Sequence, residues 1–471
     1  MLRLEHHFPL NKYDLEKILE VGLSLGGDFA DIFMEYRHYQ AVAMEEDLVK
    51  ETGEGFIQGI GVRVISGEKT GYAYTNELSL REAKKAALVA ANIARQGQPR
   101  ACCRLVAKKI DTDAYPLTIS PDKMELRQKI ELVKQAYRAC QSFDRKIIRI
   151  KAGLGDVVQF VAIANSEGLY VTDARPMVRL NCLAIAEEKN RREVGYAGAG
   201  GRVGYDYFDS VTRPEDIGKE AAIEALKLLE AVEAPAGEMP VVLAPGHSGV
   251  LVHEAVGHLL EADFIRKKTS VFCNKKGQKV GSPLVRIIDD PTIPSFRGSY
   301  NVDDEGTSPH PTLLIDKGVV MNFLQDRLSA KLMRLPLTGH GRRQDFTCFP
   351  LPRMANTFID RGETPPEEII RSVKKGIYAA RFEGGQVEDS GKFTFTISSG
   401  YLIEEGRLTA PVKQATLIGM NLDILENIVM VGTDLAFSPQ TGTCSKEGQE
   451  VPVSDGCPTI KIARMTVGGQ L

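Results

Sequence analysis

The stretch Leu251-Val-His-Glu-Ala-Val-Gly-His-Leu-Leu-Glu-Ala-Asp263 decides how the chain is interpreted, because it sets four polar side chains into an apolar segment. Those side chains are His253, Glu254, His258 and Glu261, and the rest is mainly Leu, Val and Ala, which predicts a helix docked on a core. An imidazole pair beside a carboxylate suits a hydrolytic zinc site. Neutral ring nitrogens hold the ion, and the carboxylate takes a proton from the bound water.

The two histidines are five residues apart, whereas the HExxH helix motif separates them by four. At about 100° per residue, a regular helix would splay them by about 140° around its axis. A π-bulge brings the fifth residue back round, and such bulges are frequent at functional sites. Gly257 lacks a Cβ atom and is expected to ease that distortion. A short motif also leaves open two satisfied histidines on a buried helix.

The surroundings of the motif favour a metal site. The strand-like segment Met239–Ala244 and a Pro-Gly turn at residues 245–249 precede the expected helix, so the motif begins close to a sheet edge. The chain has eight histidines, and three of them fall between His247 and His258. This concentration indicates a local function for the imidazoles.

A third ligand is available from a Gly-rich loop far downstream, Thr441-Gly-Thr-Cys-Ser-Lys-Glu-Gly448, which offers the thiolate of Cys444. Two histidines and one cysteine leave the fourth zinc position open, as in catalytic rather than structural sites. Such ligation favours zinc over metals that prefer oxygen ligands. On physical grounds alone, three other cysteines compete for this role: Cys273, Cys348 and Cys457.

The block His253-Glu-Ala-Val-Gly-His-Leu-Leu-Glu-Ala-Asp263 resembles the TldD/PmbA family of metallopeptidases, specifically the TldD-type subunit that carries the metal motif. Several separated blocks in the right order are more specific than one short motif. The further blocks lie in the C-terminal half: Asp303-Asp-Glu-Gly306, Gly339-His-Gly-Arg-Arg343, Pro352-Arg-Met-Ala-Asn-Thr357 and Gly442-Thr-Cys444.

The resemblance implies a zinc-dependent peptidase with His253, His258 and Cys444 as metal ligands and Glu254 as the general base. It also implies a dimer, which is either a homodimer or a heterodimer with a related subunit. The implied substrates are peptides or unfolded segments rather than folded proteins.

Composition sets the class of protein. A chain of 471 residues is long enough for two or three domains, and shares of 43% hydrophobic and 26% charged residues are ordinary for a soluble globular protein. The net charge is −3 with dispersed Lys and Arg, which gives no footprint for nucleic acid. No apolar run approaches the ~20 residues of a membrane span, and Met1–Phe8 has no signal-peptide core. Eight scattered cysteines indicate reduced thiols and therefore the cytoplasm.

The expected fold is α+β. Residues 1–235 are predicted to form an N-terminal domain of helices on antiparallel sheets, duplicated internally as about 1–115 and 116–235. Residues 236–471 are predicted to form a β-rich catalytic domain that carries the metal-binding helix. The Pro- and Gly-containing segment Ala231–Pro240 is the expected boundary.

Each predicted copy contains helices and strands, and a Gly-Tyr-x-Tyr strand before its last helix is the specific sign of duplication. Ser79 with Glu82 predicts a capping box, and Ser120 with Pro121 predicts a helix start. The first copy is expected to contain helices Tyr13–Leu25 and Leu80–Arg95, with strands Ala30–Tyr36, Ile60–Ile65 and Gly71–Tyr74. The second is expected to contain helices Pro121–Cys140 and Pro214–Leu229, with strands Ile147–Ile150, Gln159–Ala164, Gly168–Thr172, Met177–Ile185 and Gly204–Tyr207.

The C-terminal half is expected to be rich in strands, with a hairpin turn at Asp316-Lys-Gly318. Its predicted strands are Leu284–Asp289, Thr312–Asp316, Val319–Leu324, Phe393–Ile397, Tyr401–Ile403 and Gln414–Ile418, and its predicted short helices are Arg327–Met333 and Pro366–Lys375.

Three further polar residues are candidates for the site. Glu261 follows His258 by three residues and shares its helix face, so it either accepts the ring N–H, acts as another ligand, or is a solvated helix-end carboxylate. Arg342 and Arg343 either pair with surface acids or, in a peptidase, hold a substrate carboxylate or the oxyanion of the transition state.

Three functions are compatible with these residues. The favoured function is a zinc peptidase whose substrate binds extended, as an added strand at a sheet edge, which selects unfolded chains. The main alternative is a non-catalytic peptide-binding or partner subunit with a structural metal site. The presence of Glu254 argues against that alternative, since a structural site needs ligands but no base. Metal-dependent hydrolysis of a non-peptide amide is the third.

Overall fold

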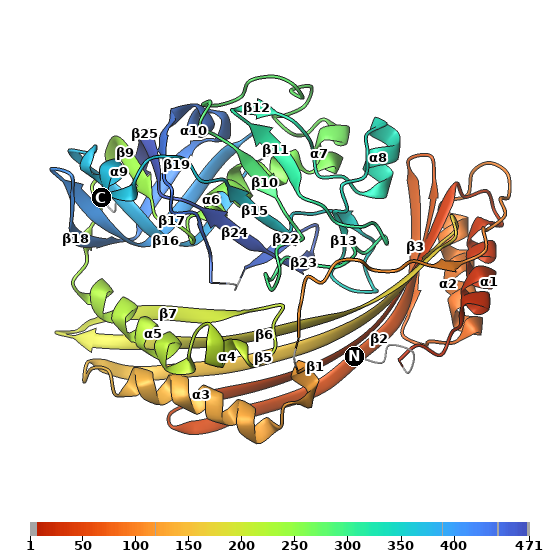
Figure 1. Ribbon diagram of the computed structural model, residues 1–471, viewed down its shortest axis with the longest axis horizontal. Helices are drawn as coiled ribbons and strands as arrows, with labels where there is room; N and C mark the ends of the chain where they lie inside the picture. Colours follow the sequence, from red (N-terminus) through yellow and green to blue (C-terminus); the bar gives the residue numbers. More distant parts are fainter. Residues whose placement is uncertain (1–6, 118, 389, 440–441, 469–471) are drawn as a thin grey trace.

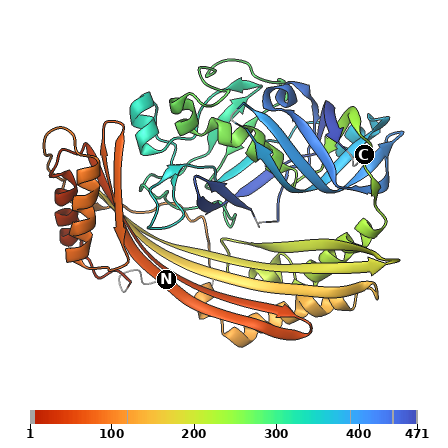
Figure 2. The same ribbon diagram turned by 180° about the vertical axis from the view of Figure 1, so that it is seen from behind.

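A long curved sheet lies beneath a β-rich C-terminal part in the computed structural model, which describes residues 7–117, 119–388, 390–439 and 442–468 (Figure 1). The predicted mixture of helices and strands with a β-rich C-terminal region is confirmed. The view from behind shows the strands of the lower sheet running beneath most of the C-terminal part (Figure 2). No helix in the described ranges is long and apolar enough to cross a membrane.

The N-terminal sheet has the strand order β3-β2-β1-β5-β6, with β7 paired to β6. Strands β1 (Phe29–Glu45) and β5 (Ile147–Asn165) pair antiparallel along their length, so both predicted copies contribute to one sheet. The other strands of this sheet are β2 (Leu48–Ser66), β3 (Lys69–Thr75), β4 (Val106–Ala107), β6 (Leu169–Glu188) and β7 (Arg191–Gly201).

These strands are fewer and longer than predicted. Ile147–Ile150 and Gln159–Ala164 belong to the single strand β5, and Gly168–Thr172 and Met177–Ile185 fall in or at the start of β6. Buried residues alternate with more exposed residues through the middle of β5, because one face of the strand packs on helices. The intervening segments are therefore paired strand rather than loop.

The expected strand at Gly204–Tyr207 is wrong. Strand β7 ends at Gly201, and the chain turns into a short helix, α4 (Tyr207–Ser210). Tyr205 is buried in this turn, and its hydroxyl donates a hydrogen bond of 2.6 Å to Asp156. The first Gly-Tyr-x-Tyr does lie in a strand, β3, so the two segments that suggested a duplication differ in structure.

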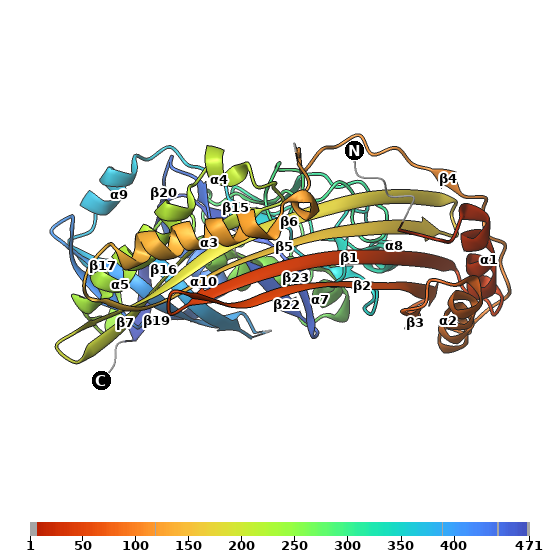
Figure 3. The same ribbon diagram turned by 90° about the horizontal axis from the view of Figure 1, so that it is seen from below.

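Helices cover the N-terminal sheet in two groups, one at each end. Helices α1 and α2 pack on one end, and α3 and α5 pack together on the other, where α3 lies across the underside of the sheet (Figure 3). The positions agree with the predicted helices within a few residues, except at the start of α3. Their bounds are α1 (Lys12–Leu23), α2 (Leu80–Ile93), α3 (Leu126–Gln141) and α5 (Pro214–Leu229).

Two predicted helix starts need correction. A 3₁₀ turn, η2, occupies Pro121–Lys123, and α3 begins only at Leu126, because the backbone of Met124 is extended. Ser79 does cap α2 by accepting the Glu82 N–H at 3.3 Å. The Glu82 carboxylate, however, pairs with Lys85 at 2.9 Å, so the reciprocal half of a capping box does not form.

The described residues of the C-terminal part form two larger sheets and two hairpins. The segment Ala231–Pro240, predicted as the domain boundary, contributes β8 and the start of β9 to the larger sheet. That sheet comprises β8 (Val232–Glu233), β9 (Gly237–Leu243), β16 (Lys375–Val387), β17 (Lys392–Glu404), β18 (Arg407–Lys413), β19 (Ala415–Met420), β20 (Ile428–Val431) and β25 (Ile460–Gly468).

The second sheet is smaller and contains the predicted hairpin, whose strands β11 and β12 pair across Lys317 and Gly318. Both turn residues have positive φ, 48° and 76°, as the favoured two-residue hairpin turn requires. The sheet comprises β10 (Ile287–Asp289), β11 (Thr312–Asp316), β12 (Val319–Val320), β15 (Asn356–Ile359), β21 (Ala436–Phe437) and β24 (Ser454–Cys457); the separate hairpins are β13 (Gly341–Arg342) with β14 (Leu351–Pro352), and β22 (Thr443–Lys446) with β23 (Gln449–Pro452).

Short helices complete the C-terminal part. Helix α8 spans Arg327–Met333 as predicted, whereas α9 ends at Arg371, four residues earlier than predicted, and α10 spans Asn421–Asn427. The histidine-bearing segment runs through the same hydrophobic core as both sheets, since Leu251, Val256 and Leu260 are buried there. This burial fixes the segment that carries the candidate ligands.

Candidate metal centre

The histidine segment changes helix type at the first histidine. Helix α6 (Gly249–Val252) leads into a π-helical turn, η3 (His253–Gly257), then a 3₁₀ turn, η4 (His258–Leu260), and finally α7 (Ala262–Lys267). The N–H of His258 donates to the carbonyl of His253, which is the i→i+5 bond that the five-residue spacing predicts. The two rings consequently approach to 5.1 Å between centroids, at an interplanar angle of 88°.

Gly257 has a different role from the one expected. Its φ of −57° and ψ of −54° are ordinary helical values, so the π-turn does not need the conformational freedom of glycine there. A Cβ atom at this position would instead lie 2.0 Å from Sδ of Met354, which is fully buried. The glycine therefore allows Met354 to pack directly against the π-turn.

Three potential ligands converge where the π-turn meets the β22–β23 hairpin. Ligand atoms of His253, His258 and Cys444 all lie within 4.8 Å of one another, and Cys444 Sγ is 3.3 Å from His258 Nε2. Among the described residues, this is the one such group of three or more His, Cys, Asp or Glu side chains. Thr441, at the start of the predicted Gly-rich loop, lies outside the described residues.

The other candidate cysteines are held elsewhere. The thiol of Cys457 contacts the Ala244 carbonyl at 3.4 Å, and that of Cys273 contacts the Ile265 carbonyl at 3.5 Å. Cys348 lies next to the Thr347 hydroxyl, at 3.6 Å. The geometry thus separates Cys444 from the alternatives that sequence reasoning left open.

Each imidazole has a carboxylate behind it. His258 Nδ1 lies 3.0 Å from Glu261 Oε2, and His253 Nδ1 lies 2.7 Å from Asp455 Oδ1. The second contact joins two buried side chains. Carboxylates in these positions fix the ring orientation and leave the opposite nitrogen of each ring for a metal.

Glu254 is the accessible acid beside the cluster. Its side chain is 31% exposed, and Oε2 lies 3.6 Å from His258 Nε2. Glu261, in contrast, is fully buried, and its second oxygen accepts the Met354 N–H at 3.2 Å. Glu254 is therefore placed to exchange protons with a substrate or water, whereas Glu261 is placed to hold the His258 ring.

The electrostatics of the cluster favour a cation. Burial raises the pKa of Cys444, but the neighbouring His253 and His258 outweigh it and hold that pKa well below its usual range. Burial lowers the pKa of His258, but the negative charges of Glu261 and Cys444 raise it to about 10. The cluster therefore holds protonated, positively charged groups beside a thiolate. A metal ion bound there would replace these protons. The donor set fits zinc.

Two further basic residues support the cluster. Arg353 Nη2 donates to the Cys444 carbonyl at 2.7 Å and lies 3.2 Å from its sulfur. Lys446 Nζ contacts Glu261 at 2.9 Å and Asp263 at 2.7 Å. Burial raises the pKa of Glu261, but Lys446 and His258 outweigh it and keep that carboxylate ionised well below its usual pKa.

Arg342 and Arg343 point to different surroundings. Arg342 donates to the carbonyls of Met354 and, at 2.7 Å, Pro452, so it supports the hairpin that carries Cys444. Arg343 packs over the Phe33 ring of the N-terminal sheet, 4.4 Å from its centroid, and donates to the Asp304 carbonyl at 3.0 Å. Neither residue pairs with a surface acid in the part of the chain that the structure describes, and Arg343 joins the two parts of the molecule.

Sequence reasoning missed Asp455, Lys446 and Arg353. Asp455 lies on β24, which pairs in parallel with β15 and brings the carboxylate to the π-turn. Arg353 lies within the block at residues 352–357, and Lys446 lies within the loop at residues 441–448. Both stretches were identified from the sequence, but for other residues. Strand β24 reads Ser-Asp-Gly-Cys, so no local pattern distinguished Asp455.

Three domain models of one known family match successive parts of the chain. The PmbA/TldA metallopeptidase C-terminal domain matches residues 236–469, the central domain of that family matches 119–229, and its domain 1 matches 30–94. The C-terminal match contains every candidate ligand.

Relatives match nearly the full chain. A Haemophilus influenzae protein named metalloprotease TldD homolog is 41% identical over 448 residues, which cover 94% of this chain and 93% of that protein. A Methanocaldococcus jannaschii protein named a metalloprotease is 35% identical over 455 residues, which cover 95% of this chain and 97% of that protein.

Solved structures share the fold. A Thermotoga maritima structure, described as a proposed modulator of a DNA gyrase, has a TM-score of 0.79 at 22% identity and covers 97% of this chain and 99% of its own. TldE from Thermococcus kodakarensis has a TM-score of 0.76 at 18% identity and covers 97% of this chain and 100% of its own. At such identities the similarity concerns architecture alone.

Proposed function

The chain belongs to the TldD/PmbA metallopeptidase family, and we propose that it is a zinc-dependent peptidase that hydrolyses peptides or unfolded polypeptide segments. One observation carries the proposal: the ligand atoms of His253, His258 and Cys444 gather within 4.8 Å beside the partly exposed Glu254. Three protein ligands leave a coordination position for a reactant, unlike the four of a structural zinc site.

His253, His258 and Cys444 would hold the metal. A zinc ion bound there supplies the Lewis acidity that polarises a peptide carbonyl. Glu254 accepts the proton of the attacking water and returns it to the leaving amine as the peptide bond breaks. Asp455 and Glu261 keep the two imidazoles oriented, through the contacts at their Nδ1 atoms.

The preference for unfolded substrates follows from how a chain would reach the cluster. Cys444 lies on the two-stranded β22–β23 hairpin, which pairs with no other strand of the described part of the chain. An extended peptide can add a strand to such an edge, whereas a folded protein offers no free strand. A folded substrate cut as fast as its denatured form would contradict this mode.

The non-catalytic alternative predicts a metal site without an accessible base. Glu254 is 31% exposed at the cluster, which is more than a structural site requires and supports the enzyme.

We also propose that the protein is cytoplasmic and forms a dimer, either with a second copy or with a related subunit. Light scattering of the purified chain, with and without such a subunit, would show which assembly forms.

The test of the proposed function is a comparison of the zinc-loaded protein with Glu254→Gln. Hydrolysis of unfolded casein by the wild type, lost by at least about 100-fold in Glu254→Gln at an unchanged zinc content, is the expected result. Equal hydrolysis by both proteins would exclude Glu254 as the base. A variant that loses its zinc would show that Glu254 supports the site rather than the reaction.

A further inference from the structure

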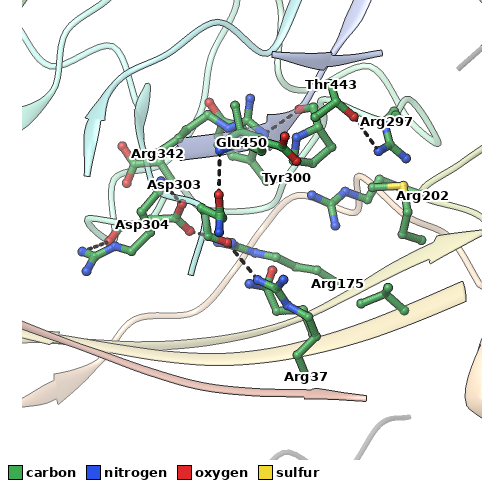
Figure 4. Close-up of a pocket in the computed structure, with 17 residues that line it drawn as sticks. Arg37, Arg175, Arg202, Arg297, Tyr300, Asp303, Asp304, Arg342, Thr443 and Glu450 are labelled. Carbon is green, nitrogen blue, oxygen red and sulfur yellow. Dashed lines mark hydrogen bonds and ion pairs between the residues drawn. The ribbon is translucent and has the colours of Figure 1, made fainter. Parts of the chain in front are cut away.

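A cavity of about 320 Å³ lies between the N-terminal sheet and the β22–β23 hairpin (Figure 4). Its wall is unusually rich in guanidinium groups, with six arginines against three acidic residues. The arginines are Arg37, Arg175, Arg202, Arg297, Arg342 and Arg343, and the acids are Asp303, Asp304 and Glu450.

Some of these arginines are already neutralised. Arg37 pairs with Glu35 at 2.6 Å, and Arg175 pairs with Asp304 at 2.6 Å and with Asp173 at 3.1 Å. Of these pairs, the one between Arg175 and Asp304 links the sheet to the C-terminal part. The charges of Arg37 and Arg175 are already balanced by these carboxylates.

Arg202 and Arg342 are different. Arg202 is 6% exposed, its Nη1 reaches only the Pro176 carbonyl at 3.4 Å, and its buried Nε has no hydrogen-bond partner among the described residues. Arg342 is 4% exposed and donates to two carbonyls, those of Met354 and Pro452. Within the described ranges, neither guanidinium forms an ion pair. Buried charges are normally paired, because an unpaired one is costly to desolvate.

We propose that this cavity binds a carboxylate of the peptide substrate, with Arg202 and Arg342 as its principal partners; the inference rests on the proposed peptidase function. A guanidinium presents parallel N–H groups that match a carboxylate bidentately. The nearby acids Asp304 and Glu450 disfavour a more highly charged ligand, so a single carboxylate fits better than a phosphate dianion.

The electrostatic state of Arg202 agrees with this assignment. Burial lowers its pKa, Tyr115 opposes this effect, and the positive charges of Arg175 and Arg342 add to it, which leaves a pKa of about 9. The guanidinium therefore remains charged at neutral pH, and no carboxylate of the described residues pairs with it. A bound carboxylate would balance this charge.

The cavity and the metal centre adjoin the same hairpin, β22–β23. Thr443, the residue before Cys444, lines the cavity, and so does Pro452, which pairs with Thr443 across the hairpin. Thr443 is exposed and Cys444 is buried, since successive residues of a strand face opposite sides. The cavity and the metal centre therefore lie on the two faces of the same hairpin.

The proposal can be tested by binding, separately from hydrolysis. Three pools of short random peptides would be titrated onto Glu254→Gln by fluorescence anisotropy. The first pool has free C-terminal carboxylates and no Asp or Glu, the second is its C-terminal amide, and the third is amidated with one Asp or Glu. The same titrations on Glu254→Gln combined with Arg202→Gln remove the proposed partner. Combination with Arg464→Gln removes an exposed arginine on β25 as the matched control.

The expected result is that the free-acid pool or the Asp/Glu pool binds about tenfold more tightly than the amide pool. Arg202→Gln should abolish that difference, and Arg464→Gln should keep it. The pool that shows the preference identifies a C-terminal or a side-chain carboxylate. Equal binding of all pools, or no binding, would overturn the proposal even if Arg202→Gln were unstable, because the peptide comparison uses the intact cavity.

Hydrolysis of the same pools by the zinc-loaded wild type distinguishes the two ideas. A carboxylate-dependent binding without hydrolysis would reject the peptidase and keep the anion site. Hydrolysis at equal rates for all pools, with no carboxylate preference in binding, would keep the peptidase and reject the anion site.

Discussion

Nδ1 of His258 lies 3.0 Å from Oε2 of Glu261, one short turn further along the same segment. The contact exists because the 3₁₀ turn after the π-turn points Glu261 back towards the histidine, where Lys446 holds the carboxylate from the other side at 2.9 Å. The sequence therefore encodes a metal-ligand candidate together with the group that orients it.

Replacing Glu261 by Gln should weaken zinc binding by about 10- to 100-fold, because the His258 ring loses the negative charge of the acceptor that orients it. Competition with a zinc chelator would measure the change. Asp263→Asn is the matched control, since Asp263 also contacts Lys446, at 2.7 Å, but does not touch the histidine. An equal loss in both variants would show that the effect comes from Lys446.

Replacing Gly257 by Ala should lower the free energy of unfolding by about 1–3 kcal/mol, because the new Cβ would lie 2.0 Å from Met354 Sδ. Urea unfolding at neutral pH would measure this change. Combining it with Met354→Ala should be less destabilising than the sum of the two single changes, since the smaller side chain makes room. Strict additivity would rule out the proposed clash.

Replacing Arg63 by Met should destabilise the protein by about 3–5 kcal/mol, because two buried carboxylates lose their partner. Arg63 on β2 contacts both Asp31 and, at 2.6 Å, Glu305 of the C-terminal part. Chemical unfolding would measure the loss, with Lys85→Met as an exposed control. A change below about 1 kcal/mol would mean that this network contributes little to holding the two parts together.

Asp289 should make the protein sensitive to acid. Burial raises its pKa, but the hydrogen bonds from His340 and Thr357 outweigh it and lower the pKa below 3.8. The stability it contributes is therefore present above that value and is lost as the pH falls through the lower pKa of the folded state. Below about pH 4, where the unfolded carboxyl begins to bind a proton, unfolding free energy should fall more steeply for the wild type than for Asp289→Asn. Parallel curves would contradict this.

Local sequence features predicted much of the site. The five-residue histidine spacing predicted the π-turn, and the hydrophobic pattern placed α5 and α8 well. The partners from distant strands could not be predicted. Asp455 reaches the cluster through the parallel pairing of β24 with β15, and no local pattern specifies a pairing between such distant segments.

The N-terminal sheet shows the same limit. The strand pattern was detected in pieces, but the long strands β5 and β6 are continuous because they pair with each other along nearly their whole length, with β1 on the other side of most of β5 and β7 beside the second half of β6. Gly257 illustrates a related limit: its sequence position suggested backbone freedom, whereas its role is to admit Met354 from another part of the chain. Contacts of this kind depend on the tertiary structure.

The most direct test of the central claim is the zinc content per chain of tag-free wild type, His258→Ala and Cys444→Ala, with Cys457→Ala as a buried-cysteine control. We expect about one zinc in the wild type and the control, and a reduced content in the other two, because both lose a ligand. Zinc retained by Cys444→Ala would show that the third ligand is wrong. No zinc in the wild type, even after reconstitution, would contradict the metal centre itself.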